Sequence, residues 1–207
     1  YILLLGWSPK GEQEIFSLKE MVELWDEHFI GKAPAIFDPQ KLRYINAEYI
    51  RALSPEAFFE KAKPYMDEAV HCECDRELLA SVLQQRCEVL SDIPEQIDFI
   101  DEMPEYELEL YTSKKMKTTP ETSKEAINAL LPVLEEVEDW TRDHIHNAAF
   151  ALIEKLGVKN GYILWPLRVA LSGKQFTPGG GIELAAILGK EKSIARLKAA
   201  QERLAQV

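Results

Sequence analysis

The residues best suited to binding chemistry lie between positions 166 and 189, where an arginine and a glycine-rich turn are flanked by apolar helical patterns. Arg168 lies on the first pattern, and Thr177, Pro178 and Gly179 begin a turn that continues with two further glycines. A glycine turn before a helix leaves backbone N–H groups unpaired and presents the positive end of the helix dipole. The stretch therefore predicts a site for a phosphate or for the edge of a base, although such glycines also mark ordinary turns.

That stretch, PLRVALSGKQFTPGGGIELAAILG, resembles the C-terminal segment of bacterial glutamyl-tRNA synthetases, which carries an LRxALxG pattern, a TPG-type turn and LLGKE. A second match, FDPQKLRYIN followed by YIR, begins at Phe37. The two matches stand in the order of the family and at about its spacing, and the resemblance covers essentially the whole chain. It implies the all-α, anticodon-binding C-terminal region of a glutamate–tRNA ligase.

The resemblance also implies which residues read the anticodon of tRNA(Glu). In the family, an arginine ahead of a Leu-x-Asp/Glu-Ile/Phe-Pro-Glu turn contacts the third anticodon base, and Arg86 precedes LSDIPE here. The family places an arginine and the TPG turn at the other two bases, and the matching residues are Arg168, Thr177, Pro178 and Gly179. Just past this turn the chain departs from the versions of the family that carry a larger apolar residue: it has Gly180 and Gly181, and we expect one residue more before the LLG-type closure.

The parent ligase implied by the resemblance charges tRNA(Glu) with glutamate, using ATP and Mg²⁺. The chain itself carries neither the His-x-Gly-His nor the Lys-Met-Ser-Lys-Ser signature of such a ligase, and it has no P-loop and no GxSxG. We therefore expect it to be non-catalytic and to hold no cofactor of its own. Its expected partners are tRNA(Glu) and the catalytic domain of the same protein, and we expect a cytoplasmic monomer without a membrane contact.

The residue pattern leaves other interpretations open. Arg86 is also placed to pair with Glu88 or Asp92 on the surface, and Arg168 is also suited to a buried, structural role. A helical protein-interaction module is the first alternative function. A small metal-binding helical protein is the second.

The metal alternative rests on four soft side chains, since His and Cys are the preferred ligands of zinc. They are His71, Cys72, Cys74 and Cys87. The Cys-x-Cys spacing is tighter than the usual Cys-x2-Cys, and Cys87 lies on the apolar face of its helical pattern. The sequence therefore predicts no metal site.

Charge is distributed unevenly along the chain. The 207 residues carry a formal net charge of -11, yet positions 151–207 hold nine Lys or Arg against four Glu. That end is therefore +5 and the remaining 150 residues are -16, an asymmetry that steers a polyanion to one face. Three cysteines, an odd number, favour a reducing compartment, and no apolar run reaches membrane-spanning length.

Local signals predict helices throughout and no strand pattern longer than a few residues. Expected starts are Ser17 (a capping box with Glu20), Ser54, Asp75, Ser123 and Thr141; expected ends are Gly157, Gly173 and Gly189. The acidic, proline-containing stretch 101–122 marks the expected boundary between two helical subdomains. We expect a connector at 1–53, a first anticodon-binding subdomain at 54–118 and a second at 119–207, packed as a bundle.

Apolar spacing predicts which helix faces are buried. Near the N-terminus these faces carry Leu18, Val22 and Trp25, and then Leu42, Ile45, Tyr49 and Leu53. On the last helix we expect Ile194, Leu197 and Leu204 to face inward, and Arg196, Lys198 and Arg203 to face outward.

Overall fold

The computed structural model describes residues 1–8, 13–31 and 36–206. These residues form ten α-helices and four short 3₁₀ turns, which confirms the all-α expectation. Extended pairing in the described ranges is limited to two isolated bridges, Trp7 with Ile30 and Ser113 with Thr118. Over the same ranges, no helix combines the length and the apolar character needed to cross a bilayer.

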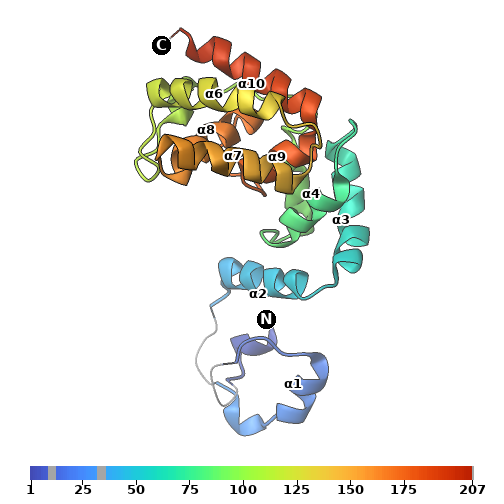
Figure 1. Cartoon of the computed structure of the whole chain (residues 1–207). Coiled ribbons are helices and arrows are strands. Elements are labelled where there is room, and N and C mark those ends of the chain that lie inside the picture. The colour runs from blue at the N-terminus through green and yellow to red at the C-terminus, as the bar shows by residue number, and fades with distance from the viewer. Residues whose placement is uncertain (9–12, 32–35, 207) are drawn as a thin grey trace.

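The helices follow one another with short connections, and the later ones pack as a bundle (Figure 1). Their bounds are α1 Leu18–Leu24, α2 Pro39–Arg51, α3 Pro55–Ala69, α4 Arg76–Gln84, α5 Ile93–Ile97, α6 Pro120–Glu135, α7 Arg142–Leu156, α8 Asn160–Ser172, α9 Gly181–Leu188 and α10 Lys190–Leu204. The 3₁₀ turns are η1 Leu3–Leu5, η2 Glu27–Phe29, η3 Leu90–Asp92 and η4 Leu108–Tyr111. In Figure 1, α6 and α10 lie side by side at the end opposite α1 and α2.

Four of the five predicted N-caps are confirmed. In each case a side-chain oxygen accepts a hydrogen bond from a backbone N–H of the first turn, which satisfies a donor that the helix leaves free. These caps are Ser17, Ser54, Asp75 and Thr141. At Ser17 the bond is reciprocal, because its own N–H donates to the Glu20 carboxylate at 2.7 Å.

The predicted helix start at Ser123 is wrong. Helix α6 begins at Pro120, and its N-cap is Thr119, whose hydroxyl accepts from the N–H of Thr122 at 3.3 Å. Thr119 followed by proline supplies both a capping oxygen and a first helical residue that needs no N–H partner. Ser123 is instead fully buried inside α6, where it faces the core.

The expected apolar face of α1 does not pack as predicted. Leu18 and Val22 are 79% and 71% exposed, and no residue of α1 is buried. The N-terminal segment instead packs around Trp7 and Phe16, which are each 2% exposed. Trp25 stacks on Trp7 with the ring centroids 5.8 Å apart. A helix of seven residues is too short to define a core by itself, and the aromatic pair outside it provides the apolar contact instead.

Helix α2 buries a face that is rotated from the expected one. Ile45 is buried as predicted, but it is joined by Ala47 and Ile50, while Leu42 and Tyr49 are exposed. The Tyr49 ring is not buried in the core; its hydroxyl donates a hydrogen bond to the carbonyl of Phe16. Polar contacts thus decide the orientation of α2 along with its apolar pattern.

One apolar core runs from Ile50 to Leu204 and joins every helix from α3 onward. Helix α3 packs against both α4 and α5, and α6 to α10 form the bundle beside them. Helix α4 packs against α9, and the N–H of Asp75 donates to the carbonyl of Ile187 at 3.1 Å. This contact brings the chain after α4 close to the turn between α8 and α9.

The burial of two leucines gives a direct test of this core. We expect Leu130→Ala, at a fully buried position in α6, to lower the free energy of unfolding by about 2–5 kcal/mol. Leu18→Ala makes the same chemical change at a 79% exposed helical position and should change it by less than about 0.5 kcal/mol. Urea unfolding followed by circular dichroism measures both, and equal losses would contradict the described packing.

Candidate nucleic-acid interface

The turn between α8 and α9 is built from bonds within the chain. Gly173 ends α8 in the left-handed conformation, with φ of 62°, as glycine does at many helix ends. The Thr177 hydroxyl donates to the carbonyl of Gly179 at 2.6 Å. Thr177, Pro178 and Gly179 are all buried. The turn is therefore rigid, and its threonine side chain is already used inside it.

Helices α8 and α9 approach so closely at Gly181 that no side chain fits there. A Cβ on Gly181 would lie 2.9 Å from Cγ of Leu167 and 3.1 Å from the backbone nitrogen of Arg168. Distances of this size force the neighbouring groups to move. This contact explains in physical terms why a glycine, rather than a larger apolar residue, follows the turn.

A carboxylate of the same chain pairs one of the N–H groups that were expected to be unpaired in the glycine turn, that of Gly180. The N–H of Gly180 donates to Oε2 of Glu183 at 3.0 Å, and Oε1 of Glu183 accepts from Nε of Arg142 at 3.2 Å. The chain thus places its own carboxylate at the positive end of the helix. A phosphate at this point would meet a negative charge, so the helix start is a poor anion site.

Arg86 reaches the same turn from the other side. It follows α4, its side chain is exposed, and its Nη1 donates to the carbonyl of Thr177 at 3.4 Å. The two acids that were considered as its surface partners are taken by Arg43 of α2. Arg43 donates through Nε to Glu88 at 2.8 Å and through Nη2 to Asp92. The Arg86 guanidinium is therefore directed at the turn.

Arg168 lies on α8 at the opposite side of the turn and is half-buried. Its Nε is fully buried and has no hydrogen-bond partner among the described residues. Burial lowers the pKa of Arg168, the nearby charge of Arg86 lowers it further, and Glu183 opposes both effects. The guanidinium carbon lies 5.9 Å from the centre of the Trp165 ring. Two arginines thus flank one rigid turn, and one of them retains an unused donor.

A shallow pocket of about 350 Å³ opens beside Arg86. Its lining residues are Arg86, Glu95, Gln96, Lys174, Phe176, Thr177 and Pro178. Phe176 is 78% exposed, although it is a large aromatic side chain. The Lys174 side chain is engaged within the chain, because its Nζ donates to the Glu95 carbonyl at 2.9 Å and pairs with Asp98. The pocket thus combines an exposed arginine with an exposed aromatic ring.

Phe176 was missed by the reasoning from sequence. Its signal is its position directly before a Thr-Pro-Gly turn, where small and polar residues are the usual choice. A large aromatic side chain there has no helix face on which to pack, so it remains in solvent. The same reasoning missed Glu183, which lies at the third helical position, where a glutamate can accept a hydrogen bond from the N–H of the N-cap residue even when that residue is glycine.

A second pocket of about 460 Å³ lies on the Arg168 side of the turn. It is lined by Trp165, Arg168, Gly180 and Glu183, and also by His146 and Phe150 of α7. The rings of His146 and Phe150 stack with centroids 4.1 Å apart. Planar side chains and an arginine again lie together, which is the composition that holds unstacked bases.

The soft side chains that suggested zinc are not gathered. His71 pairs with Asp101 at 2.9 Å, and Cys87 is fully buried in the core. Within the described ranges, no group of three or more His, Cys, Asp or Glu side chains is placed to hold a metal ion. The geometry gives the metal-binding alternative no support.

Comparison with known families identifies the family to which the chain that carries these residues belongs. The family described as the anticodon binding domain matches residues 46–201, which is most of the chain. The chain belongs to the anticodon-binding domain family. The matched range includes both arginines and the whole turn between α8 and α9.

Two relatives of this anticodon-binding domain are glutamate–tRNA ligases of clostridia. It is 51% identical over 205 residues to a glutamate–tRNA ligase of Clostridium acetobutylicum, and 49% identical over 204 residues to that of Clostridium tetani. Each match covers 99% of the chain and 42% of the relative. The chain therefore spans about two fifths of the length of these relatives.

Solved structures give the same result. A glutamate tRNA ligase from Elizabethkingia meningosepticum superposes with a TM-score of 0.76 at 27% identity, over 98% of this chain and 40% of that one. A glutamate-tRNA synthetase from Elizabethkingia anophelis gives the same TM-score over 97% of this chain and 39% of that one. Fold and family thus agree, as the resemblance implied.

The basic end of the anticodon-binding domain is not the free face that its charge suggested. Arg196 and Arg203 of α10 were expected to point outward, but both turn in toward backbone carbonyls. Arg196 donates to the carbonyls of Leu171 at 2.5 Å and Phe99 at 2.7 Å. Arg203 donates to the carbonyl of Tyr106, with its guanidinium carbon 4.1 Å from the ring centre of the same residue. These arginines hold segments together, so the candidate interface rests on Arg86 and Arg168.

The close approach at Gly181 yields a test of how the anticodon-binding domain sets its turn. Gly181→Ala places a methyl group against Leu167 and the backbone of Arg168, and we expect it to lower the free energy of unfolding by about 1–3 kcal/mol. Gly6→Ala is the control, since a Cβ there meets nothing within 4 Å. Thermal or urea unfolding of the two variants measures the difference, and an unaffected Gly181→Ala chain would contradict the contact.

Proposed function

We propose that this chain reads the anticodon loop of tRNA(Glu) as the anticodon-binding part of a glutamate–tRNA ligase. The observation that carries the proposal is the contact between the Arg86 guanidinium and the Thr177 carbonyl, which lie 91 residues apart in the chain. It places Arg86 at the turn, and Arg168 lies near enough to Arg86 for the two charges to interact. The names of the relatives support the choice of tRNA.

This arrangement suits a single-stranded loop. Proteins recognise such loops by separating the bases, stacking on them and hydrogen-bonding to their Watson–Crick edges. Arginine provides several donors in a fixed plane and also stacks. We assign Arg86 to the third anticodon base, and Arg168 with Thr177, Pro178 and Gly179 to the other two. Because the Thr177 hydroxyl is engaged inside the turn, the turn contributes backbone groups and shape.

Phe176 extends the assignment. Its exposed ring borders the same pocket as Arg86, and an exposed ring next to a cation provides a platform for an unstacked base. Gly180 and Gly181 provide no side chain for stacking at the end of the turn. Phe176, at the other end of the turn, takes over that role in this proposal.

We assign the chemistry of the ligase to the remainder of the parent protein, where ATP and Mg²⁺ would serve to charge tRNA(Glu) with glutamate. Within this chain we retain a connector at 1–53, a first subdomain at 54–118 that holds α3 to α5, and a second at 119–207 that holds α6 to α10. We further propose that the parent is a cytoplasmic monomer. Three free cysteines agree with a reducing compartment.

Replacement of Arg86 tests the readout of the third base. We expect Arg86→Ala to weaken binding of a tRNA(Glu) anticodon stem-loop by about 1–3 kcal/mol, and to remove the preference over a loop whose third anticodon base is changed. Titration of both loops at several salt concentrations measures affinity and preference together. Equal losses for the matched and changed loops would mean that Arg86 does not read the base.

The control for that experiment is Lys198→Ala on α10. Lys198 is 54% exposed and pairs with Glu135 at 2.8 Å, outside the two pockets. Loss of a phosphate contact lowers the affinity for all loops alike, so this variant should leave the preference for the matched loop intact. If the unmodified chain binds no stem-loop under any salt condition, a helical protein-interaction module becomes the better interpretation.

Replacement of Phe176 tests the stacking platform. We expect Phe176→Ala to weaken stem-loop binding by about 1–3 kcal/mol, because one stacked base loses its partner, while Phe176→Trp keeps most of the affinity. Phe37→Ala is the matched control, since Phe37 is also an exposed phenylalanine (56%) but lies beside α2. Fluorescence anisotropy with a labelled stem-loop measures these changes. Similar losses in the Phe37 and Phe176 variants would argue against stacking at the turn.

A further inference from the structure

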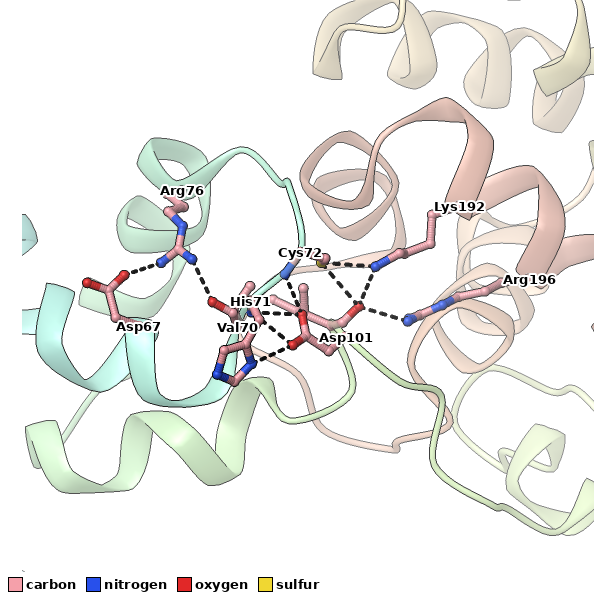
Figure 2. A network of polar contacts seen from close by, with 9 residues as sticks. Asp67, Val70, His71, Cys72, Arg76, Asp101, Lys192 and Arg196 are labelled. Carbon is pink, nitrogen blue, oxygen red and sulfur yellow. Dashed lines mark hydrogen bonds and ion pairs between the residues drawn. The ribbon is translucent and has the colours of Figure 1, made fainter.

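The short segment after α3, residues 70–75, is fixed by a carboxylate. Asp101 accepts from the N–H of His71 at 2.8 Å and from the N–H of Cys72 at 3.1 Å, and it pairs with the His71 ring at 2.9 Å. These bonds lower the pKa of Asp101 despite the opposing effect of partial burial. Figure 2 shows the carboxylate between the two residues. The Cys72 backbone is therefore held in one place.

The Cys72 side chain faces an amine. Nζ of Lys192, on α10, lies 3.0 Å from Sγ of Cys72 and donates at the same distance to the carbonyl of Ile100. Arg196, one turn further along α10, donates to that carbonyl too (Figure 2). The amine is thus positioned at the sulfur by a second contact, with the Ile100 carbonyl.

The pair can be reached from solvent. Cys72 is only partly buried, and a pocket of about 550 Å³ is lined by Cys72, Cys74, Gly189, Lys190 and Lys192. A small oxidant can therefore reach the sulfur and the amine from the same side.

The other two thiols are less suited to oxidation. Cys87 is fully buried, and burial raises its pKa to about 11. Burial is also the main cause that raises the pKa of Cys74, with a further contribution from nearby Cys72. Because the thiolate is the reactive form, a raised pKa makes a thiol a weaker nucleophile at neutral pH.

We propose that Cys72 and Lys192 form an oxidation site that closes into a covalent sulfur–nitrogen link in the presence of a peroxide. In the first step the Cys72 thiolate attacks one peroxide oxygen and the O–O bond breaks. The Lys192 ammonium gives a proton to the departing hydroxide. The products are a sulfenic acid at Cys72, a water molecule and a neutral amine at Lys192.

In the second step the Lys192 amine attacks the sulfenic sulfur, and the S–O bond breaks. The hydroxide leaves with a proton from the amine as a second water molecule. One peroxide is reduced to two waters while the sulfur and nitrogen together lose two hydrogens, so atoms and electrons balance. The same condensation of a sulfenic acid with nitrogen is known for backbone amides.

The link joins two parts of the fold that carry different proposed contacts. Cys72 precedes α4, which leads to Arg86, whereas Lys192 follows α9 and the turn beside Arg168. Oxidation would therefore tie the segment before α4 covalently to α10, two parts that the described structure joins only by non-covalent contacts. This inference does not depend on the proposed anticodon assignment, because the reaction needs only the two side chains and a peroxide.

Mass spectrometry of the 207-residue chain after treatment with hydrogen peroxide tests the proposal. We expect a crosslinked pair of peptides that contain Cys72 and Lys192, lighter by two hydrogens than the two peptides together, and lost on treatment with excess thiol. A disulfide between Cys72 and Cys74, stable sulfenic or sulfinic acid at Cys72 without a crosslink, or an unmodified Cys72 would each overturn it.

Matched variants identify the atoms involved. Cys72→Ser should lose the crosslink, and Lys192→Arg should lose it while leaving a sulfenic acid that a cyclic diketone traps. Cys74→Ser and Lys190→Arg, which change the neighbouring thiol and the neighbouring amine of the same pocket, should keep it. Far-ultraviolet circular dichroism confirms that each variant is folded. A crosslink that persists in Lys192→Arg would overturn the assignment of the nitrogen.

Discussion

Helix α4 packs against α9, and the backbone bond from Asp75 to Ile187 fixes the point at which they meet. Everything proposed about recognition depends on this packing, because Arg86 and the turn are distant in sequence and share no helix. The close approach of α8 to α9 at Gly181 then sets Arg168 against the other side of the turn. These two helix–helix contacts thus bring Arg86, the turn and Arg168 close together although they are far apart in the sequence.

Several basic side chains of this molecule hold backbone segments together. Lys190, Lys192 and Arg196 all donate to backbone carbonyls of other segments. These bonds satisfy carbonyls at the ends of helices and in loops, where no helical N–H is available. The total of basic residues in the C-terminal segment therefore overstates the charge available to a polyanion. Geometry, rather than charge count, identifies the few cations that are free to bind.

Local signals in the sequence predicted much of the fold. Helix caps such as Ser17, Ser54 and Asp75 act within one turn of chain, so their residue types suffice to locate them. The orientation of a helix face depends on partners far along the chain. This is why Leu18 and Leu42 were placed inside incorrectly, and why a polar bond from Tyr49 could rotate α2.

For the candidate site as well, short local patterns could be recognised in the sequence, whereas contacts between distant segments could not. Resemblance to a family identified Arg86, Arg168 and the turn, because those residues form short recognisable strings. Glu183 at the start of α9 and the exposed Phe176 were overlooked although both carry a local signal, because neither belongs to the strings on which the resemblance rests. Nor did spacing reveal the contact between Cys72 and Lys192, which lie 120 residues apart.

The pairing of Arg43 with Glu88 and Asp92 has an effect beyond holding α2 in place. Both acids lie within six residues of Arg86, and left uncompensated they would compete with a nucleic acid for its guanidinium. Arg43 occupies them with its own charge and so acts as an internal counter-ion. In the proposed interface, Arg43 would in this way leave the Arg86 guanidinium without competition from these two acids. An overall acidic protein can bind RNA when its carboxylates are neutralised locally by its own cations.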